Sequence, residues 1–441
     1  MQVANRPLIL IIVGVLATWL PAVAQDAASA PSDQRWNIHF QATSIGQEHG
    51  SFPSPYEGAN SLPPHPEKRV SITGTIFLTY RVNSWTQVVF NPEEAGGKGF
   101  GSVTGIAGFT NGEMPRVASA TPTLYVARGY IQNTWALGGE TEVRESGANQ
   151  LAGKIPVRRL TLINGRFSLM DFFNTNKYSD DPRIQFMNWS LMYNGAWDYP
   201  ADVRGYTVGS LQELTMRTWS LRAASTMMST VANGPTLDTR IAKNRGEVVE
   251  WDHRHSPFGH AGVFRALGYL NRERAGTFRL APIVDGVPDL GPTRRPGTKK
   301  YGLTLDMEQE IAPNVGVFGR YGWSDGKTEA WEFTEIDRSL SGGVSINGNA
   351  WRRSRDTIGV AAVRNYLAGD QRCFLAAGGM GFNIGDGRLN YAPESIVESY
   401  YALGVTKQWT VTLDYQRVVN PAYNRDRGPV SVGSLRLHWE R

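Results

Sequence analysis

Apolar and polar residues alternate along several stretches of this chain with a period of two. The pattern is clearest in residues 70–82, 300–311 and 409–416. Successive side chains of a β-strand point to opposite faces, so each stretch predicts a strand with one apolar and one polar face. In 300–311 the apolar positions are Tyr301, Leu303, Leu305, Met307 and Ile311, and the polar positions are Lys300, Thr304, Asp306, Glu308 and Glu310.

The length of these strands indicates a membrane barrel. The three stretches have 8 to 13 residues, whereas a strand of a soluble protein has most often about 5–6. Several of them carry an aromatic residue at one or both ends of the apolar face. Lipid-facing strands with aromatic girdles and a polar lumen have this pattern, whereas a soluble β-sandwich would have shorter strands and more connections.

Further strand candidates follow the same pattern. They are 36–44, 84–91, 123–134, 156–168, 203–213, 217–227, 245–254, 260–271, 314–323, 329–340, 354–367, 394–407 and 430–439. An alternating run at 186–193 brings the number of runs to seventeen. Bacterial single-chain barrels have an even number of strands, so one of the runs is not a wall strand. Gly-, Pro- and Asn-rich segments predict long connections at 92–122, 272–298, 368–393 and 420–429.

The N-terminus predicts export from the cytoplasm. Arg6 precedes an apolar core at 8–20, and Ala22-Val23-Ala24 has the small residues of a cleavage site. This core is shorter than the roughly 20 residues of a membrane-spanning helix. We therefore expect a signal peptide at 1–24, a flexible segment at 25–35 and the barrel at 36–441.

Composition supports one large β-structure. Charged residues make up 19% of the chain, below the roughly 25% typical of soluble domains. The net charge of +5 is small and dispersed, which gives no indication of a nucleic-acid partner. Cys373 is the only cysteine, so no internal disulfide can form and stability must come from another source, such as a closed hydrogen-bonded barrel.

The most distinctive stretch is 165–209. It begins like a strand, continues through a loop rich in Asp and Asn, passes the run QFMNWSLMYN and reaches GAWDYPAD. Residues 169–184 are too polar to face lipid and too numerous for a tight hairpin, so we expect them to fold into the lumen. The alternation at 186–193 places Trp189 and Tyr193 on a lipid-facing side.

This stretch also carries candidate ligand-binding groups. Trp and Tyr rings can cover the apolar faces of sugars, and planar Arg and carboxylate groups can bond paired hydroxyls. The alternative interpretation is structural, because the loops of a water-filled barrel are also tethered by Asp–Arg pairs. The candidate constriction residues are Arg166, Asp171, Asn174, Asn176, Asp181, Arg183, Trp197, Asp198, Asp202 and Arg204.

The 165–209 stretch resembles the hallmark block of the carbohydrate-selective porins, the OprB family of bacterial outer membranes. The segments AAGGMGFNIGDG, within 368–393, and NPAYNRDRGP, at 420–429, resemble the family's late segments. The resemblance implies an all-β, transmembrane antiparallel β-barrel of about 16 strands with inward-folded loops. It also implies passive diffusion of mono- and oligosaccharides across the outer membrane, with carbohydrates, outer-membrane lipid and the barrel-assembly machinery as partners.

Other functions have weaker support in the residues. GGKGFG at 96–101 lacks the GK[ST] ending of a phosphate-binding loop, and the chain has no GxSxG motif. We expect no enzyme, no cofactor and no metal site. A barrel-based hydrolase, a soluble lectin and an anion-selective or general diffusion porin remain as alternatives, and both a monomer and a trimer stay open. The chain ends on Arg441, and Trp439 is the aromatic residue nearest to that end.

Overall fold

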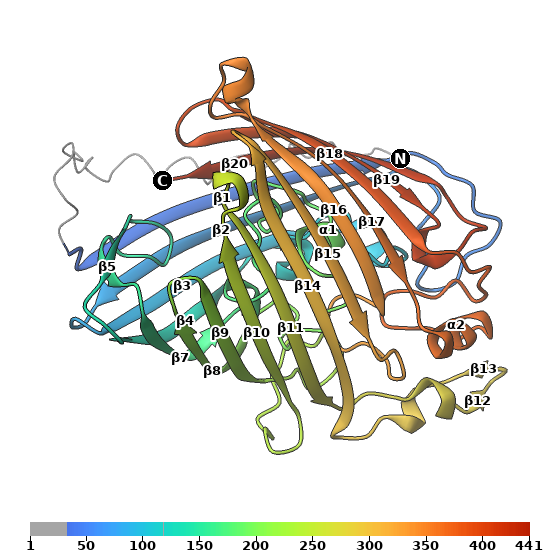
Figure 1. The fold of residues 1–441 in the computed structure, drawn as a ribbon. Coiled ribbons are helices and arrows are strands. Elements are labelled where there is room, and N and C mark those ends of the chain that lie inside the picture. Colours follow the sequence, from blue (N-terminus) through green and yellow to red (C-terminus); the bar gives the residue numbers. More distant parts are fainter. Residues whose placement is uncertain (1–32, 118) are drawn as a thin grey trace.

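The alternating stretches pair side by side into a closed antiparallel barrel of sixteen strands in the computed structural model (Figure 1), which describes residues 33–117 and 119–441. The expected signal peptide at 1–24 lies outside the described residues. The wall strands are β1 (Trp36–His49), β2 (Glu67–Arg81), β3 (Thr86–Gly97), β4 (Thr123–Ala136), β7 (Arg159–Phe167), β8 (Thr207–Thr215), β9 (Trp219–Met227), β10 (Arg245–His255), β11 (Gly262–Glu273), β14 (Thr298–Ala312), β15 (Val315–Ser324), β16 (Arg338–Asn347), β17 (Thr357–Tyr366), β18 (Glu394–Gly404), β19 (Trp409–Val419) and β20 (Val430–Glu440).

Pairing between the first and last strands closes the barrel. Gln41 of β1 lies opposite Glu440 of β20, and the register continues to His49 opposite Val432. A closed sheet leaves no strand edge unpaired, which is the condition for placing strands in lipid.

The two faces of the wall follow the sequence pattern. On β14 the predicted apolar positions are on the outside, and Leu305 and Met307 are 38% and 44% exposed. The alternate positions Thr304 and Asp306 are 1% exposed because they face the filled interior. The predicted separation of an apolar and a polar face is therefore confirmed.

Short and long connections lie at opposite ends of the barrel. Turns such as 82–85 and 405–408 are short, whereas the segments 98–122, 168–206 and 367–393 at the other end are long. Short turns mark the periplasmic end of outer-membrane barrels. The predicted long connections are confirmed, although 92–97 belongs to β3.

One connection at the periplasmic end is an exception. Residues 137–158, between β4 and β7, contain a small hairpin of β5 (Thr141–Arg144) and β6 (Gly153–Pro156). A second small hairpin, β12 (Ile283–Val284) with β13 (Val287–Pro288), lies in the long connection between β11 and β14.

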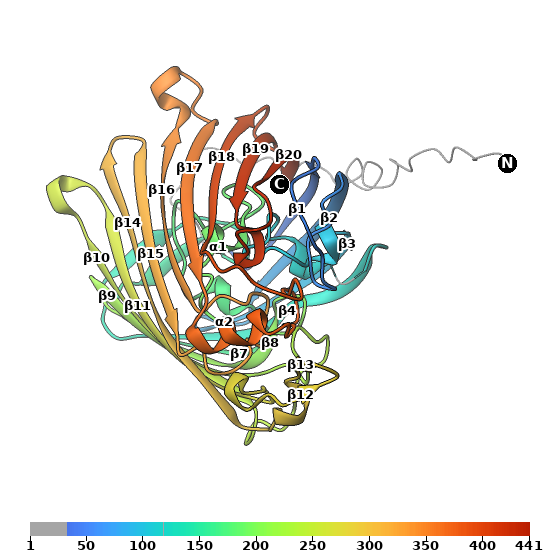
Figure 2. The same cartoon turned by 90° about the vertical axis from the view of Figure 1, so that its right-hand side faces the viewer.

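The run at 186–193 is not a wall strand, and its removal leaves sixteen. It contains the short helix α1 (Trp189–Met192), which lies inside the ring of strands (Figure 2). Every residue from 186 to 202 is buried, so the alternation there does not separate lipid from water. The prediction that Trp189 and Tyr193 face lipid is therefore wrong.

The structure differs from the sequence prediction in two further places: the start of β16 and a helix in a segment predicted to be a connection. The predicted strand at 329–340 is wrong over most of its length, because β16 begins at Arg338 and 329–337 is a buried inward loop. The other α-helix, α2 (Gly369–Ala376), lies in the β17–β18 connection. Among the described residues, no helix is long and apolar enough to cross a membrane.

The hydrophobic core lies inside the barrel, between the inward loops and the wall. In the largest cluster Leu211, Val248 and Leu267 of the wall pack with Phe173 and Trp197 of the 168–206 segment. A second cluster joins Phe186 and Leu191 to the inner faces of β17 and β18. The loops therefore replace water over much of the lumen.

The inward loop 325–337 is held by the carboxyl group of Glu335. Its Oε2 accepts hydrogen bonds from the backbone N–H groups of Asn383 and Ile384 at 3.0 and 3.1 Å, and its Oε1 accepts one from Gln371 Nε2 at 3.2 Å. Burial raises the pKa of Glu335 to about 8, although the two backbone donors oppose this shift.

A charge at the middle of the outer face should destabilise the barrel. We expect Leu305→Arg to lower the free energy of unfolding in lipid by about 2–4 kcal/mol, because the guanidinium would lie near the bilayer midplane. Ile283→Arg, in the exposed hairpin of β12 and β13, is the matched control and should change this free energy little. Denaturant titration of protein refolded into vesicles measures both, and equal effects would contradict the placement of β14 in lipid.

The Glu335 carboxyl should make stability depend on pH. Its pKa is raised above the value of an accessible Glu, so the stability it contributes is complete below about pH 4.5 and is lost as the pH rises through about 8. Glu335→Gln should therefore match the wild type in melting temperature at pH 5 and exceed it at pH 9. Circular dichroism in detergent measures this, with Glu145→Gln in an exposed turn as the control. A variant less stable than the wild type at pH 9 would disprove the assignment.

Candidate functional site

Segment 168–206 crosses the lumen and is tethered to the wall by carboxylates. Glu250 Oε2 accepts a hydrogen bond from the backbone N–H of Asn174 at 2.7 Å, and Glu308 Oε2 accepts one from that of Lys177 at 2.6 Å. Further along the segment, Glu398 accepts from the N–H groups of Met187 and Asn188 at 2.5 and 2.9 Å. The predicted inward fold of residues 169–184 is thus what the structure shows.

The tethering carboxylates of β10 and β14 belong to a belt of alternating charges. Arg222 contacts Glu213, Glu250 and Asp252 at 2.7–3.0 Å. On the next strands, Arg265 lies 3.1 Å from Asp306 and 3.3 Å from Glu308. The belt crosses adjacent strands from β8 to β14, so both signs of charge line this part of the inner wall.

Six of the ten candidates are buried, and five of these six, all except Asp202, belong to this scaffold. Asn174 is fully buried with φ 55°, and its Oδ1 accepts a hydrogen bond from Asn194 N at 3.1 Å. Asn176 Nδ2 donates to Asp306 at 3.0 Å. Arg183 lies 2.9 Å from Glu113 and 3.2 Å from Glu93, which ties the segment to β3 and to the 98–122 connection.

The remaining two of these five are Trp197 and Asp198. The Trp197 ring is 3% exposed and lies 5.5 Å from Tyr199 and 6.3 Å from Phe173. Asp198 accepts hydrogen bonds from the N–H groups of Trp331 and Glu332 at 2.9 and 2.8 Å. Burial raises the pKa of Asp198 to about 6, although Lys300 and both donors oppose the shift. Both side chains therefore lie in the packed interior.

The other candidates are more accessible, apart from Asp202. Arg166 is bonded to Asp202 at 2.5 Å, and its side chain is 25% exposed whereas that of Asp202 is 6% exposed. Arg204 lies over the ring of Tyr125, 4.0 Å from its centre.

Asp171, with 24% of its side chain exposed, pairs with Arg128 of β4 through two hydrogen bonds. Asp181 is half-buried and accepts a hydrogen bond from the backbone N–H of Arg183 at 2.8 Å, as in a turn.

We call Arg128, Arg166, Arg204, Asp171 and Asp202 the arginine column. They lie on β4, on β7 and on the inward segment that follows it. Tyr206 joins two of them, because the guanidinium carbons of Arg128 and Arg166 lie 5.4 and 5.6 Å from the centre of its ring. The column offers planar donors beside carboxylate acceptors.

Sequence reasoning missed Arg128, Glu93 and Tyr206. Tyr206 Oη donates to Glu93 Oε1 at 2.9 Å, so it connects the column with β3. Arg128 of β4 and Glu93 of β3 point inward, and both residues come more than 35 residues before the distinctive stretch. The charge of Arg128 within the alternating run 123–134 was the available signal, whereas Glu93 lies in the segment 92–122 that was predicted to be a connection.

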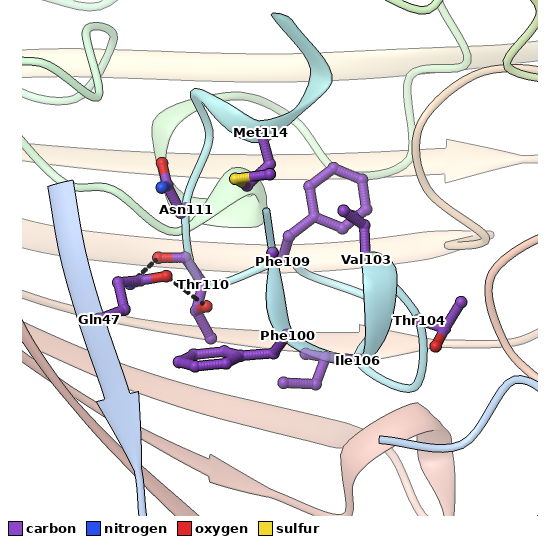
Figure 3. A pocket seen from close by; sticks show the side chains of 10 residues that line it. Gln47, Phe100, Val103, Thr104, Ile106, Phe109, Thr110, Asn111 and Met114 are labelled. Carbon is purple, nitrogen blue, oxygen red and sulfur yellow. Dashed lines mark hydrogen bonds between the residues drawn. The ribbon is translucent and has the colours of Figure 1, made fainter. Parts of the chain in front are cut away.

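A cavity beside β1 is too small to be the site (Figure 3). It is lined by Phe100, Val103, Phe109 and Met114 of the 98–122 connection and by Gln47. Gln47 and Thr110 exchange hydrogen bonds of 2.9 and 3.0 Å at its edge. Its volume of about 20 Å³ is close to the minimum that holds one water molecule.

Comparison with solved structures shows that this chain has the fold of known outer-membrane channels. The high-pH structure of Pseudomonas putida OprB is 14% identical, with 94% of this chain and 100% of that chain covered and a TM-score of 0.69. Its low-pH structure is 10% identical, with 92% and 93% covered and a TM-score of 0.50. The outer membrane channel DcaP of Acinetobacter baumannii is 7% identical, with 92% and 97% covered and a TM-score of 0.51.

Comparison with curated protein sequences gives no significant match. The family model of the carbohydrate-selective porin, OprB family, matches residues 81–440, which includes β3 to β20 and the arginine column. The closed barrel, the inward loops and this match over most of the chain agree: the protein belongs to the OprB family and is a passive, carbohydrate-selective porin of the bacterial outer membrane.

Proposed function

We propose that sugars pass along the inner wall of β4 and β7 and that the arginine column is the selective constriction. The observation that carries this proposal is the pairing of Arg166 of β7, whose side chain is 25% exposed, with the buried Asp202 of the inward segment, 2.5 Å away. The family is one of channels rather than of enzymes, so the residues are required to bind and release a solute without changing it.

The chemistry of the column suits neutral polyhydroxylated solutes. A guanidinium presents several N–H donors in one plane, and a carboxylate accepts from adjacent hydroxyls. Tyr125, with Arg204 over its ring, adds a flat surface that can lie against the C–H face of a sugar. Because conduction requires release, each of these contacts should be weak.

Pairing of charges argues against the second candidate, an anion-selective channel. Three guanidinium groups on one wall would favour anions if they stood alone. However, Arg128 is paired with Asp171 and Arg166 with Asp202. The paired charges reduce the net field along the column while keeping donors and acceptors in place.

The five buried candidates outside the arginine column have a different role in this proposal. Asn174, Asn176, Arg183, Trp197 and Asp198 fix the position of segment 168–206, and the arginine column contacts the solute. The two groups should differ in how substitutions affect sugar transport and stability.

Replacing Arg204 should weaken sugar binding without unfolding the barrel. Arg204→Gln removes the cation over Tyr125, and we expect block of the ion current by neutral sugar to weaken about two- to fivefold, as for a loss of about 0.5–1 kcal/mol. Planar-bilayer recordings with glucose and maltose measure this. Lys177→Gln, an exposed residue of the same segment, is the control and should retain the block. Unchanged block in Arg204→Gln would exclude Arg204 from the constriction.

Replacing Trp197 should act through packing. Trp197→Ala removes a buried ring and should cost about 3–5 kcal/mol of stability, lowering the temperature at which the heat-modifiable gel band shifts and increasing current noise. Trp197→Phe should restore most of this. A Trp197→Ala protein with wild-type heat stability and a specific loss of sugar block would instead make Trp197 a direct sugar contact.

A further inference from the structure

The hairpin between β4 and β7 folds into the periplasmic mouth of the barrel. Asn37 Nδ2, on the inner face of β1, donates to the carbonyls of Gly147 and Gln150 at 3.0 and 2.6 Å. Asn91 Nδ2, on the inner face of β3, donates to Asn149 Oδ1 at 2.9 Å. In Figure 1, β5 lies at the same end of the barrel as the last residues of β20. The hairpin is therefore a fixed part of the mouth.

A pocket of about 310 Å³ lies between this hairpin and the wall. Arg81 and Gln87 line it from the inner faces of β2 and β3, and Ser84 and Trp85 line it from the turn between those strands. Arg144 and Lys154 line it from the hairpin. The volume is at the lower end of the range for small-molecule sites, which is about 300–1,000 Å³.

The lining of the pocket has an excess of positive charge. Three of its residues, Arg81, Arg144 and Lys154, are cationic. The nearby Glu142 is paired with Arg159 at 3.2 Å. Asp33 lies against Gly153 at the edge of the pocket and balances one charge at most.

Arg144 is the least satisfied of these cations. Within the described ranges its guanidinium makes no hydrogen bond or ion pair, and its Nε is buried without a partner. Burial, followed by the charges of Arg159 and Arg81, lowers the pKa of Arg144. A buried donor without an acceptor is costly, and an anion would supply the acceptor.

We propose that this pocket binds an acidic sugar, with the carboxylate or phosphate group of the solute between Arg144, Arg81 and Lys154. Ser84 and Gln87 supply hydrogen-bonding groups for hydroxyls, and Leu151 and Ile155 supply apolar surface. The inference rests on the proposed function only because the solute reaches the pocket through the lumen. Neutral sugars are recognised at the arginine column and acidic sugars bind additionally at the exit.

Direct binding tests the pocket separately from transport. The mature protein in detergent is titrated calorimetrically with glucuronate, glucose 6-phosphate, glucose and inorganic phosphate. We expect both acidic sugars to bind more tightly than glucose and phosphate, and the tighter of the two identifies the preferred anionic group. Arg144→Gln with Lys154→Gln should weaken that binding at least about tenfold, because two charged contacts are removed.

Two controls keep the result interpretable. Arg158→Gln removes an exposed cation outside the pocket lining and should leave binding unchanged. Lys154→Gln alone changes an exposed side chain. This single variant therefore replaces the double variant in the binding measurement if the double variant does not fold. Block by neutral glucose should be the same in all these variants, which distinguishes failure of the pocket from failure of the arginine column.

The following results would overturn the inference. If glucose binds as tightly as glucuronate, the negative charge does not contribute to binding. If inorganic phosphate binds as tightly as the acidic sugars, the sugar does not contribute to binding. Undiminished glucuronate binding in the double variant, or in Lys154→Gln if only that variant folds, would place the anion elsewhere.

Discussion

Backbone hydrogen bonding in lipid is the constraint on which this structure depends. No water in the bilayer core can satisfy an open strand edge, so sixteen strands close through the pairing of β1 with β20. Closure fixes the direction of every wall side chain. The outer positions meet lipid, and the inner positions, including Glu250, Asp306 and Glu398, meet whatever fills the lumen.

Much of the lumen is filled by the protein itself, and wall carboxylates hold the filling in place. Glu394 accepts hydrogen bonds of 2.9 Å from the N–H groups of Ala107, Gly108 and Ala422, so it joins two long connections. Glu250, Glu308 and Glu398 do the same for segment 168–206. Loops lack the internal pairing of helices and sheets, and buried N–H groups need acceptors. Inward-pointing carboxylates supply them, and apolar clusters between loop and wall add packing.

This division explains what the sequence could predict. Strands such as β14 follow a simple period because one face always meets lipid. The run at 186–193 has the same period, but packed protein surrounds it on all sides, so periodicity carried no information about its neighbours. Likewise, the sequence marked Asp198 as a polar residue of interest, whereas its role depends on the N–H groups of Trp331 and Glu332, which are more than 130 residues away. The hairpin at 137–158 gave no signal because its two strands have only four residues each.

Inward loops also determine how a charged lumen can select a neutral solute. A wall of unpaired arginines would attract anions, and bare carboxylates would attract cations. When Arg166 lies against Asp202 and Arg128 against Asp171, the long-range field is reduced but the directional donors and acceptors stay in place. A sugar hydroxyl can both donate and accept, so it can bond to each member of such a pair, whereas a simple ion interacts favourably with only one. Folding of segment 168–206 onto β4 and β7 creates these pairs, so the tethers that hold the segment also establish the chemistry of the proposed constriction.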